Sequence, residues 1–158
     1  MTSPASALAS ADTGEFSQTK NFLTITISNQ IFGIPVLQVQ DVLGPQKVTR
    51  VPLAPPSVAG ALNLRGRIVT AIDVKRCLNL TSDTPPKAMS VVVEHNHELY
   101  SLIIDHVGDV IPLKDVDFEP NPATLDPLWK GISHGIYRLD KQLLVVLDVP
   151  KLLESVNS

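Results

Sequence analysis

One arginine in this sequence stands where it could bind a partner, at the tip of a predicted hairpin. Residues 60–73 contain two apolar runs separated by Arg65-Gly66-Arg67, with Asn63 just before them. This pattern predicts a tight β-hairpin, and Gly66 can adopt the positive φ that the turn needs. Arg65 would then be displayed on a short, rigid loop, either as a binding residue or as an ordinary solvated tip. We expect the apolar residues of the hairpin to be buried, namely Leu62, Leu64, Ile68, Val69, Ala71 and Ile72.

The other reactive side chains do not converge on a catalytic or metal site. His95 and His97 could share a strand face and ligate a metal, but no third ligand stands at a recognisable spacing, so a solvated hairpin tip is the better interpretation. Cys77 is expected to be a small core residue and Trp129 a plug for a barrel. No phosphate loop, nucleophile elbow or zinc signature is present. The sequence therefore predicts a protein without catalytic residues, metal or cofactor.

Composition excludes several classes of protein. The net charge is −3, which is not the basic footprint of a nucleic-acid-binding protein. No run of 18 apolar residues predicts a membrane span, and the N-terminus does not resemble a secretory signal. A single cysteine among 158 residues indicates a cytoplasmic protein without disulfides. Thirteen prolines and few aromatic residues favour many short elements built on Val, Leu and Ile.

The elements expected to position the hairpin are mostly short strands. Leu23, Ile25 and Ile27 alternate with polar residues, which indicates a half-buried strand over 22–28. Asp73 is expected to cap a helix over 74–80, and Asp148, at the equivalent position in the second half of the chain, is expected to be a cap as well. The remaining expected elements are a strand at 31–34, a helical turn followed by a strand over 36–43, a strand at 48–51, a helical turn at 57–60, and strands at 89–93 and 99–104.

The second half of the chain repeats the first, which predicts an internal duplication. The matched pairs are Phe32 with Tyr100 and Asp41 with Asp109, both 68 residues apart, Gly60 with Gly131, 71 apart, and Asp73 with Asp148, 75 apart. A longer second hairpin would explain the growing offset. Each copy should form a small five-stranded antiparallel barrel, and two such small units should pack together to share apolar surface.

These observations predict an all-β fold of two packed five-stranded barrels. Residues 1–20 are expected to be a disordered leader, with the first barrel at about 21–87 and the second at about 88–150. A C-terminal helix over about 150–156 carries one apolar stripe and is expected to cover a barrel.

Taken together, the motifs of residues 20–155 resemble the CheW family, the coupling proteins of bacterial chemotaxis. The resemblance rests on the segments Phe32-Gly-Ile34, Leu37-x-Val39-Gln-Asp41-Val42, Asn63-Leu-Arg-Gly66 with Ile72-Asp73, and Ile104-Asp105-x-Val107-x-Asp109-Val110. The sequence departs from the family pattern where Asp41 stands in place of a common Glu and Thr70 in place of a common Pro.

The resemblance implies two SH3-like barrels and a non-catalytic, cytoplasmic adaptor that is recruited to membrane receptor arrays without inserting into the membrane. Its partners would be the histidine kinase CheA and the cytoplasmic tip of methyl-accepting chemotaxis receptors. The implied receptor- or kinase-binding residues are Val39, Asp41, Gly60, Asn63, Arg65 and Val107.

Two other functions remain open on the sequence. One is a generic SH3-like peptide-binding module, although the aromatic residues that line grooves for Pro-rich ligands are missing. The other is a β-barrel enzyme or small-ligand protein, for which no convergent set of polar residues is evident.

Overall fold

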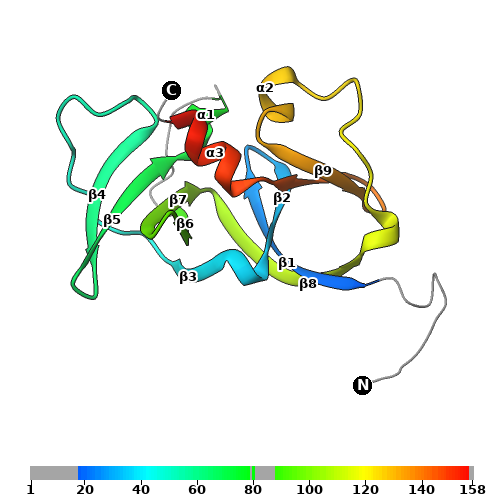
Figure 1. Ribbon diagram of the computed structural model, residues 1–158, viewed down its shortest axis with the longest axis horizontal. Helices are drawn as coiled ribbons and strands as arrows, with labels where there is room; N and C mark the ends of the chain where they lie inside the picture. Colours follow the sequence, from blue (N-terminus) through cyan, green and yellow to red (C-terminus); the bar gives the residue numbers. More distant parts are fainter. Residues whose placement is uncertain (1–17, 79, 81–87, 157–158) are drawn as a thin grey trace.

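The computed structural model describes residues 18–78, 80 and 88–156, which form ten strands in two five-stranded sheets (Figure 1). Each sheet curls into a small barrel, so the predicted all-β fold class is confirmed. Barrel A has the strand order β8-β1-β2-β10-β9, with β1 Thr19–Ile27, β2 Gln30–Pro35, β8 His106–Lys114, β9 Ser133–Arg138 and β10 Leu143–Leu147. Barrel B has the order β3-β6-β7-β5-β4, with β3 Val39–Leu43, β4 Val58–Leu64, β5 Arg67–Asp73, β6 Met89–His95 and β7 Glu98–Ile104.

Three tight two-residue turns set the register of the hairpins. Both central residues have positive φ at Ser28-Asn29, Arg65-Gly66 and Asn96-His97, as turns that match the twist of the strands require. The hairpin predicted around Arg65 is therefore confirmed. His97 lies in the turn between β6 and β7, which is the hairpin tip that the sequence indicated. The start of β1 at Thr19 shortens the expected leader, of which residues 1–17 lie outside the described part of the chain.

The two halves of the chain exchange strands, which corrects the predicted division into barrels at 21–87 and 88–150. Barrel A takes β1 and β2 from the first half and β8, β9 and β10 from the second, whereas barrel B takes β3, β4 and β5 from the first half and β6 and β7 from the second. The predicted division fails because edge strands of each half pair with strands of the other half. Strand β3 pairs with β6 rather than with β1 or β2, and β8 pairs with β1 rather than with β6 or β7.

The registers of the two barrels repeat, as a duplicated unit should. Phe22 pairs with Pro35, and Ser90 pairs with Ile103, so both positions shift by 68 (90 − 22 = 68; 103 − 35 = 68). In the later hairpins Ala61 pairs with Thr70 and Ile136 pairs with Val145, a shift of 75 on both strands (136 − 61 = 75; 145 − 70 = 75). The two hairpins therefore keep the same register, and the expected longer second hairpin is wrong.

Gly60 corresponds to Gly135, not to Gly131 as the sequence pattern indicated. Their φ values are 154° and 155°, and a Cβ at Gly60 would lie 2.2 Å from the Thr49 carbonyl oxygen. This close approach lets Thr49 pair with Ala61, and the equivalent bridge in barrel A joins Glu119 to Ile136. Each bridge brings a connecting segment against the edge of its barrel. The Thr49–Ala61 bridge also accounts for two expectations that were wrong. Residues 58–60 are extended in β4 and do not form a helical turn over 57–60, and the expected strand 48–51 is reduced to this single bridge.

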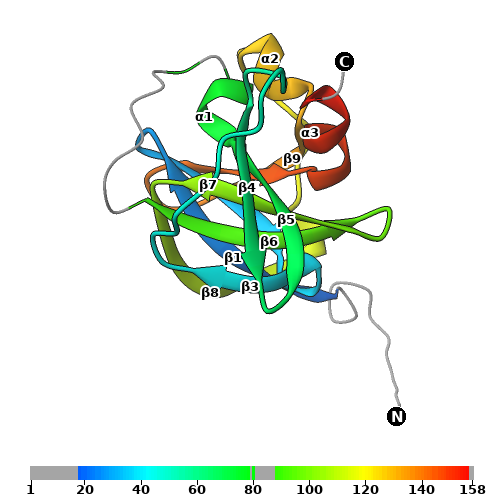
Figure 2. The same cartoon turned by 90° about the vertical axis from the view of Figure 1, so that its left-hand side faces the viewer.

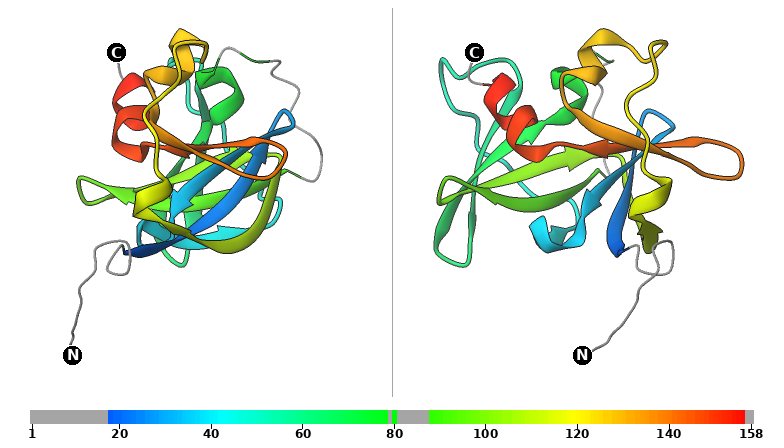
Figure 3. Two further views of the ribbon diagram at one scale, coloured as in Figure 1. Left: turned by 90° about the vertical axis from the view of Figure 1, so that its right-hand side faces the viewer. Right: turned by 45° about the vertical axis from the view of Figure 1, so that its right-hand side comes forward.

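The main core lies between the barrels and under three short helices, α1 Val74–Cys77, α2 Pro127–Lys130 and α3 Val149–Val156 (Figures 1 and 3). The buried side chains Leu152, Leu153 and Val156 of α3 join this core, so the apolar stripe predicted there is confirmed. Trp129 packs against Phe32, with ring centroids 5.4 Å apart. Cys77 packs on the same core, and burial raises the pKa of its thiol.

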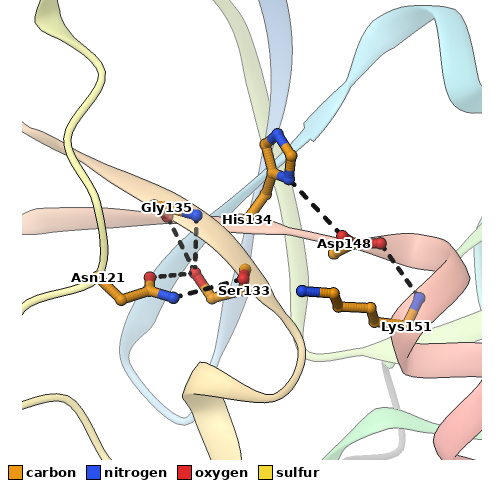
Figure 4. Close-up of polar contacts among 6 residues, drawn as sticks. All are labelled: Asn121, Ser133, His134, Gly135, Asp148 and Lys151. Atoms are coloured by element: carbon orange, nitrogen blue, oxygen red, sulfur yellow. Dashed lines mark hydrogen bonds and ion pairs between the residues drawn. The ribbon is translucent and has the colours of Figure 1, made fainter.

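Aspartates cap all three α-helices of the described residues, and at α2 Asp126 accepts a hydrogen bond of 2.8 Å from the Leu128 N–H. Asp73 accepts a hydrogen bond from the Lys75 N–H, and Asp148 accepts one from the Lys151 N–H at 3.1 Å (Figure 4). Asp148 also lies 3.7 Å from His134 Nδ1. Since the first turn of a helix has unpaired N–H groups, these carboxylates stabilise the points where α1 and α3 leave their barrels.

A half-buried ion pair links the two barrels on one side. Lys75 Nζ of α1 lies 2.8 Å from Asp105 Oδ1, and the two side chains are 14% and 16% exposed. The other carboxylate oxygen accepts a hydrogen bond from the Ser28 N–H in the β1–β2 turn. Asp105 therefore joins the helix that follows barrel B to a turn of barrel A.

Candidate functional site

Arg65 and Asp41 meet at one end of barrel B. The tip of the β4–β5 hairpin and strand β3 lie at the same end of the barrel (Figures 1 and 2). Arg65 Nη2 is 3.0 Å from Asp41 Oδ2. The arginine side chain is 77% exposed, whereas that of the aspartate is 26% exposed. The guanidinium can therefore keep this contact and still offer N–H groups to a partner.

Asp41 is held more firmly than its partner. A β-bulge between Val39 and Asp41 turns the strand, so Asp41 pairs with Val92 and shares the face of Leu43, toward the interior of barrel B. Val39 pairs with Val93 and packs against the main core. Its Oδ1 accepts a hydrogen bond from the Val42 N–H, and its Oδ2 is shielded from solvent. The Arg65 guanidinium lies against this oxygen as its counter-charge.

Asn63 positions the tip that carries Arg65. Its Oδ1 accepts a hydrogen bond of 2.9 Å from the Gly66 N–H, which closes the turn. Arg65 itself has a φ of 53°, a conformation that is uncommon outside glycine, asparagine and aspartate. The exposed Asn63 side chain therefore acts on the backbone of the turn, and through it on the direction in which Arg65 projects.

In the described part of the chain, the remaining predicted site residues, Val39, Gly60 and Val107, make no hydrogen bond or ion pair with the side chain of Asp41 or Arg65. Val39 lies two residues from Asp41 in β3 and is half-buried against the main core. Val107 occupies the equivalent position in β8 of barrel A (107 − 39 = 68). Gly60 is buried in β4, where its missing side chain leaves room for the Thr49 carbonyl. Asp41, Asn63 and Arg65 are therefore brought together, while Gly60 has a structural explanation of its own.

Ile68 is a surface residue that the sequence analysis assigned to the core. It is 70% exposed and pairs across the hairpin with Asn63, next to the Arg65 turn. The strand alternation explains this, because Val69 and Ala71 face the barrel interior and place Ile68 on the opposite face. Ile72 lies on the same face as Ile68 and is buried in the main core, so the exposure of Ile68 also depends on its place next to the hairpin tip. An exposed isoleucine beside an exposed arginine gives the tip both apolar and charged contact area.

The Asp41–Arg65 pair occurs in barrel B and cannot be repeated in barrel A. Asp109 stands at the position equivalent to Asp41, but the residue that corresponds to Arg65 is Asp140 (140 − 65 = 75). Two carboxylates at these positions cannot form an ion pair. The duplicated barrels therefore differ in charge at equivalent ends, and only one of them presents an arginine there.

Within the described residues, no group of three or more His, Cys, Asp or Glu side chains is arranged to hold a metal ion. In the same part of the chain, no helix has the length and apolarity needed to cross a membrane. What the candidate site offers is an exposed guanidinium, a carboxylate and an isoleucine on a rigid hairpin. This set suits recognition of another protein rather than chemistry on a substrate.

Comparison with known proteins identifies similar chains over the same region. The family model described as "CheW-like domain" matches residues 21–157. The chain is 29% identical over 137 residues to "Chemotaxis protein CheW" of Klebsiella aerogenes, covering 86% of this chain and 82% of that protein. It is also 29% identical to "Chemotaxis protein CheW" of Helicobacter pylori, over 84% of this chain and 81% of the other. The crystal structure of the scaffolding protein TtCheW from Thermoanaerobacter tengcongensis matches with a TM-score of 0.74 and 25% identity, over 82% of this chain and 89% of that one.

Proposed function

The chain belongs to the CheW-like domain family, and from that premise we propose that it couples methyl-accepting chemotaxis receptors to a CheA-type histidine kinase. Proteins of this family are non-catalytic scaffolds in chemotaxis. In our proposal the chain works in the cytoplasm, where it binds the receptor tips and the CheW-like domain of the kinase. It acts by raising the effective concentration of one partner near the other.

The observation that carries this proposal is the exposed guanidinium of Arg65, held in place by Asp41. A binding residue needs a fixed direction and free donors, and Arg65 has both, because the turn and the 3.0 Å ion pair orient it while 77% of its side chain remains exposed. Ile68 adds apolar surface beside it. We therefore assign receptor or kinase contact to Arg65, with Asp41 and Asn63 as the residues that position it. Val39, in β3, and Val107, at the equivalent position in β8, stay proposed contact residues.

The proposal predicts that Arg65→Ala lowers partner binding without unfolding the protein. An exposed ion pair contributes within about 1 kcal/mol to stability, so the melting temperature should change little. Binding to receptor-containing membranes or to CheA should weaken at least about tenfold, which corresponds to about 1.4 kcal/mol. Arg65→Lys should recover part of this loss, because lysine restores the charge but not the planar fork of donors. Co-sedimentation and calorimetric titration, made beside a thermal melt, measure both properties.

Arg67→Ala is the matched control, since Arg67 is also exposed and stands two residues away, at the start of β5. It should bind both partners like the unmodified chain. Binding of the unmodified chain should also weaken with salt more steeply than binding of Arg65→Ala, which has lost a charged contact. Unchanged binding by Arg65→Ala would show that the tip is a solvated loop, and equal losses for the two arginine variants would show that the tip supplies positive charge without a specific role for Arg65.

A further inference from the structure

Barrel B contains an open pocket of about 260 Å³ at one end of its interior. The strands β4, β6 and β7 and the segment after β3 contribute its walls. The residues that line it and matter here are Val48, Ala59, Leu62, Met89, Ser90 and Ser101. Ser90 and Ser101 are buried, and no lining residue carries a charge. The pocket is therefore a mostly apolar space with two hydroxyl groups and a mouth to solvent.

Aromatic rings fill the same space in barrel A. Phe22, Phe118 and Tyr137 form two edge-to-face pairs, both with ring centroids 5.5 Å apart. Phe22 and Tyr137 are 3% and 2% exposed, so these rings close the interior of that barrel. Such pairs are a favoured way for aromatic side chains to pack. Barrel A thus shows that three aromatic rings fit into the interior of such a barrel at that end.

The repeat relates each ring of barrel A to a smaller side chain of barrel B. Phe22 corresponds to Ser90 (90 − 22 = 68) and Tyr137 to Leu62 (137 − 62 = 75). All four residues belong to strands whose registers repeat.

Phe118 corresponds to Val48, because Phe118 directly precedes Glu119 and Val48 directly precedes Thr49, the two residues that form the isolated bridges. A Cβ on the paired glycine would meet the Phe118 ring in barrel A and Val48 Cγ1, at 2.6 Å, in barrel B. Replacement of three rings by serine, leucine and valine therefore leaves the pocket.

We propose that this pocket binds one aromatic ring, supplied by a phenylalanine or tyrosine side chain of a partner protein. A cavity of about 150 Å³ is enough for benzene in a protein interior, so a pocket of about 260 Å³ holds a phenyl or phenol ring. The uncharged lining favours a side chain on a neutral backbone over a free aromatic metabolite, whose charged groups would lose water without gaining a partner. This inference does not depend on the proposed coupling of receptor and kinase.

The test uses the full chain and a neutral probe, N-acetyl-phenylalaninamide. Titration is followed by the NMR shifts of methyl groups in the pocket wall, at Ala59, Met89 and Ile103. These signals should move together and saturate, while N-acetyl-leucinamide should bind at least fivefold more weakly. Free phenylalanine and phenylpropionate, which carry charges, should also bind at least fivefold more weakly. Equal binding of the aliphatic probe, or tighter binding of a charged one, would overturn the proposal.

Ser90→Phe should close the pocket, because it restores the ring that barrel A has at the equivalent position. The variant should remain folded and lose saturable binding of the probe. Gln142→Phe is the matched control, since it adds the same side chain at an exposed site on the β9–β10 connection and should bind like the unmodified chain. If Ser90→Phe does not fold, Val48→Phe replaces it on the Phe118 pattern. Undiminished binding by a folded, filled variant contradicts the assignment.

A ring from the chain itself is the competing occupant that the experiment must exclude. Residues 81–87, which precede the pocket residue Ala88, contain no aromatic residue, and Phe16 is the aromatic residue of the segment 1–17. Phe16→Ala should therefore leave the affinity for the probe unchanged. A clear gain in affinity in Phe16→Ala would mean that Phe16 occupies the pocket, and that no partner is required to fill it.

Discussion

Gly60, which the family resemblance implied as a binding residue, also has a role in the backbone. Its φ of 154° and the Thr49 carbonyl, 2.2 Å from where a Cβ would stand, both exclude a side chain. The same pair of features occurs at Gly135, beside Phe118 and Glu119. A glycine shared by both barrels serves the architecture that the barrels share. Arg65, which barrel A lacks, is the residue that can give barrel B a separate task.

Gly60→Ala is therefore expected to destabilise the protein by more than about 1 kcal/mol, because the backbone must move or the Thr49–Ala61 bridge must open. Gly44→Ala is the control, since a Cβ there meets nothing within 4 Å. Urea unfolding curves of the two variants measure the difference. If Gly60→Ala is as stable as Gly44→Ala but binds partners poorly, Gly60 belongs to the binding surface after all.

At the scale of elements, very short helices depend on the residues that precede them. α1 spans four residues and α3 eight, so intrinsic helix stability is negligible and the packing and the caps decide whether they form. Asp73 is the last residue of β5 and Asp148 directly follows β10, so both stand at the end of the second strand of their hairpins. The predicted role of both aspartates as caps is confirmed by their hydrogen bonds to backbone N–H groups.

Asp148→Ala should lower the free energy of unfolding by about 1 kcal/mol, which for a chain of this size lowers the melting temperature by about 2–4 °C. Asp148→Asn should recover most of the loss, since the amide oxygen also accepts from the Lys151 N–H. Asp140→Ala, at the exposed end of the β9–β10 connection, controls for the loss of a negative charge. Equal melting temperatures for Asp140→Ala and Asp148→Ala would show that α3 is held by its apolar face alone.

At the scale of the whole molecule, the exchange of strands makes each barrel depend on both halves of the chain. β3 lies on β6 and β8 lies on β1, so no barrel is complete within residues 18–87 or within 88–156. The main core draws buried residues from both halves, and the Lys75–Asp105 ion pair joins them again. The molecule should consequently unfold as one cooperative unit.

Two separately produced fragments, 1–84 and 85–158, should each be unfolded by circular dichroism, because each lacks the pairing partners of its edge strands. Mixed in equal amounts, they should form a one-to-one complex with the β-sheet spectrum of the intact chain. Size exclusion and circular dichroism before and after mixing measure this. A fragment 85–158 that folds alone would support the consecutive barrels that the sequence indicated, against the exchanged strands.

The sequence by itself determined the local structure. Alternation of apolar residues identified the strand over 22–28, Arg65-Gly66 identified a tight turn, and Asp73 and Asp148 were recognised as helix caps. It also revealed the duplication, because equivalent residues recur in the same order, 68 residues apart in the early strands and 75 apart in the later hairpins. These features are encoded by neighbouring residues, whose side chains decide which face is buried and which turn is allowed without reference to distant parts of the chain.

Only the tertiary structure decided which strands pair, since two similar copies offer each strand two similar partners. The apolar pattern of β3, which places Val39 toward the core, would fit a partner strand from its own half of the chain as well as one from the other half. Packing around the shared core selects β6 as the partner of β3. The pocket beside Ser90 has the same origin, because its volume depends on side chains from four separate segments. Such a volume is fixed by how those segments meet in space, and no single stretch of sequence encodes it.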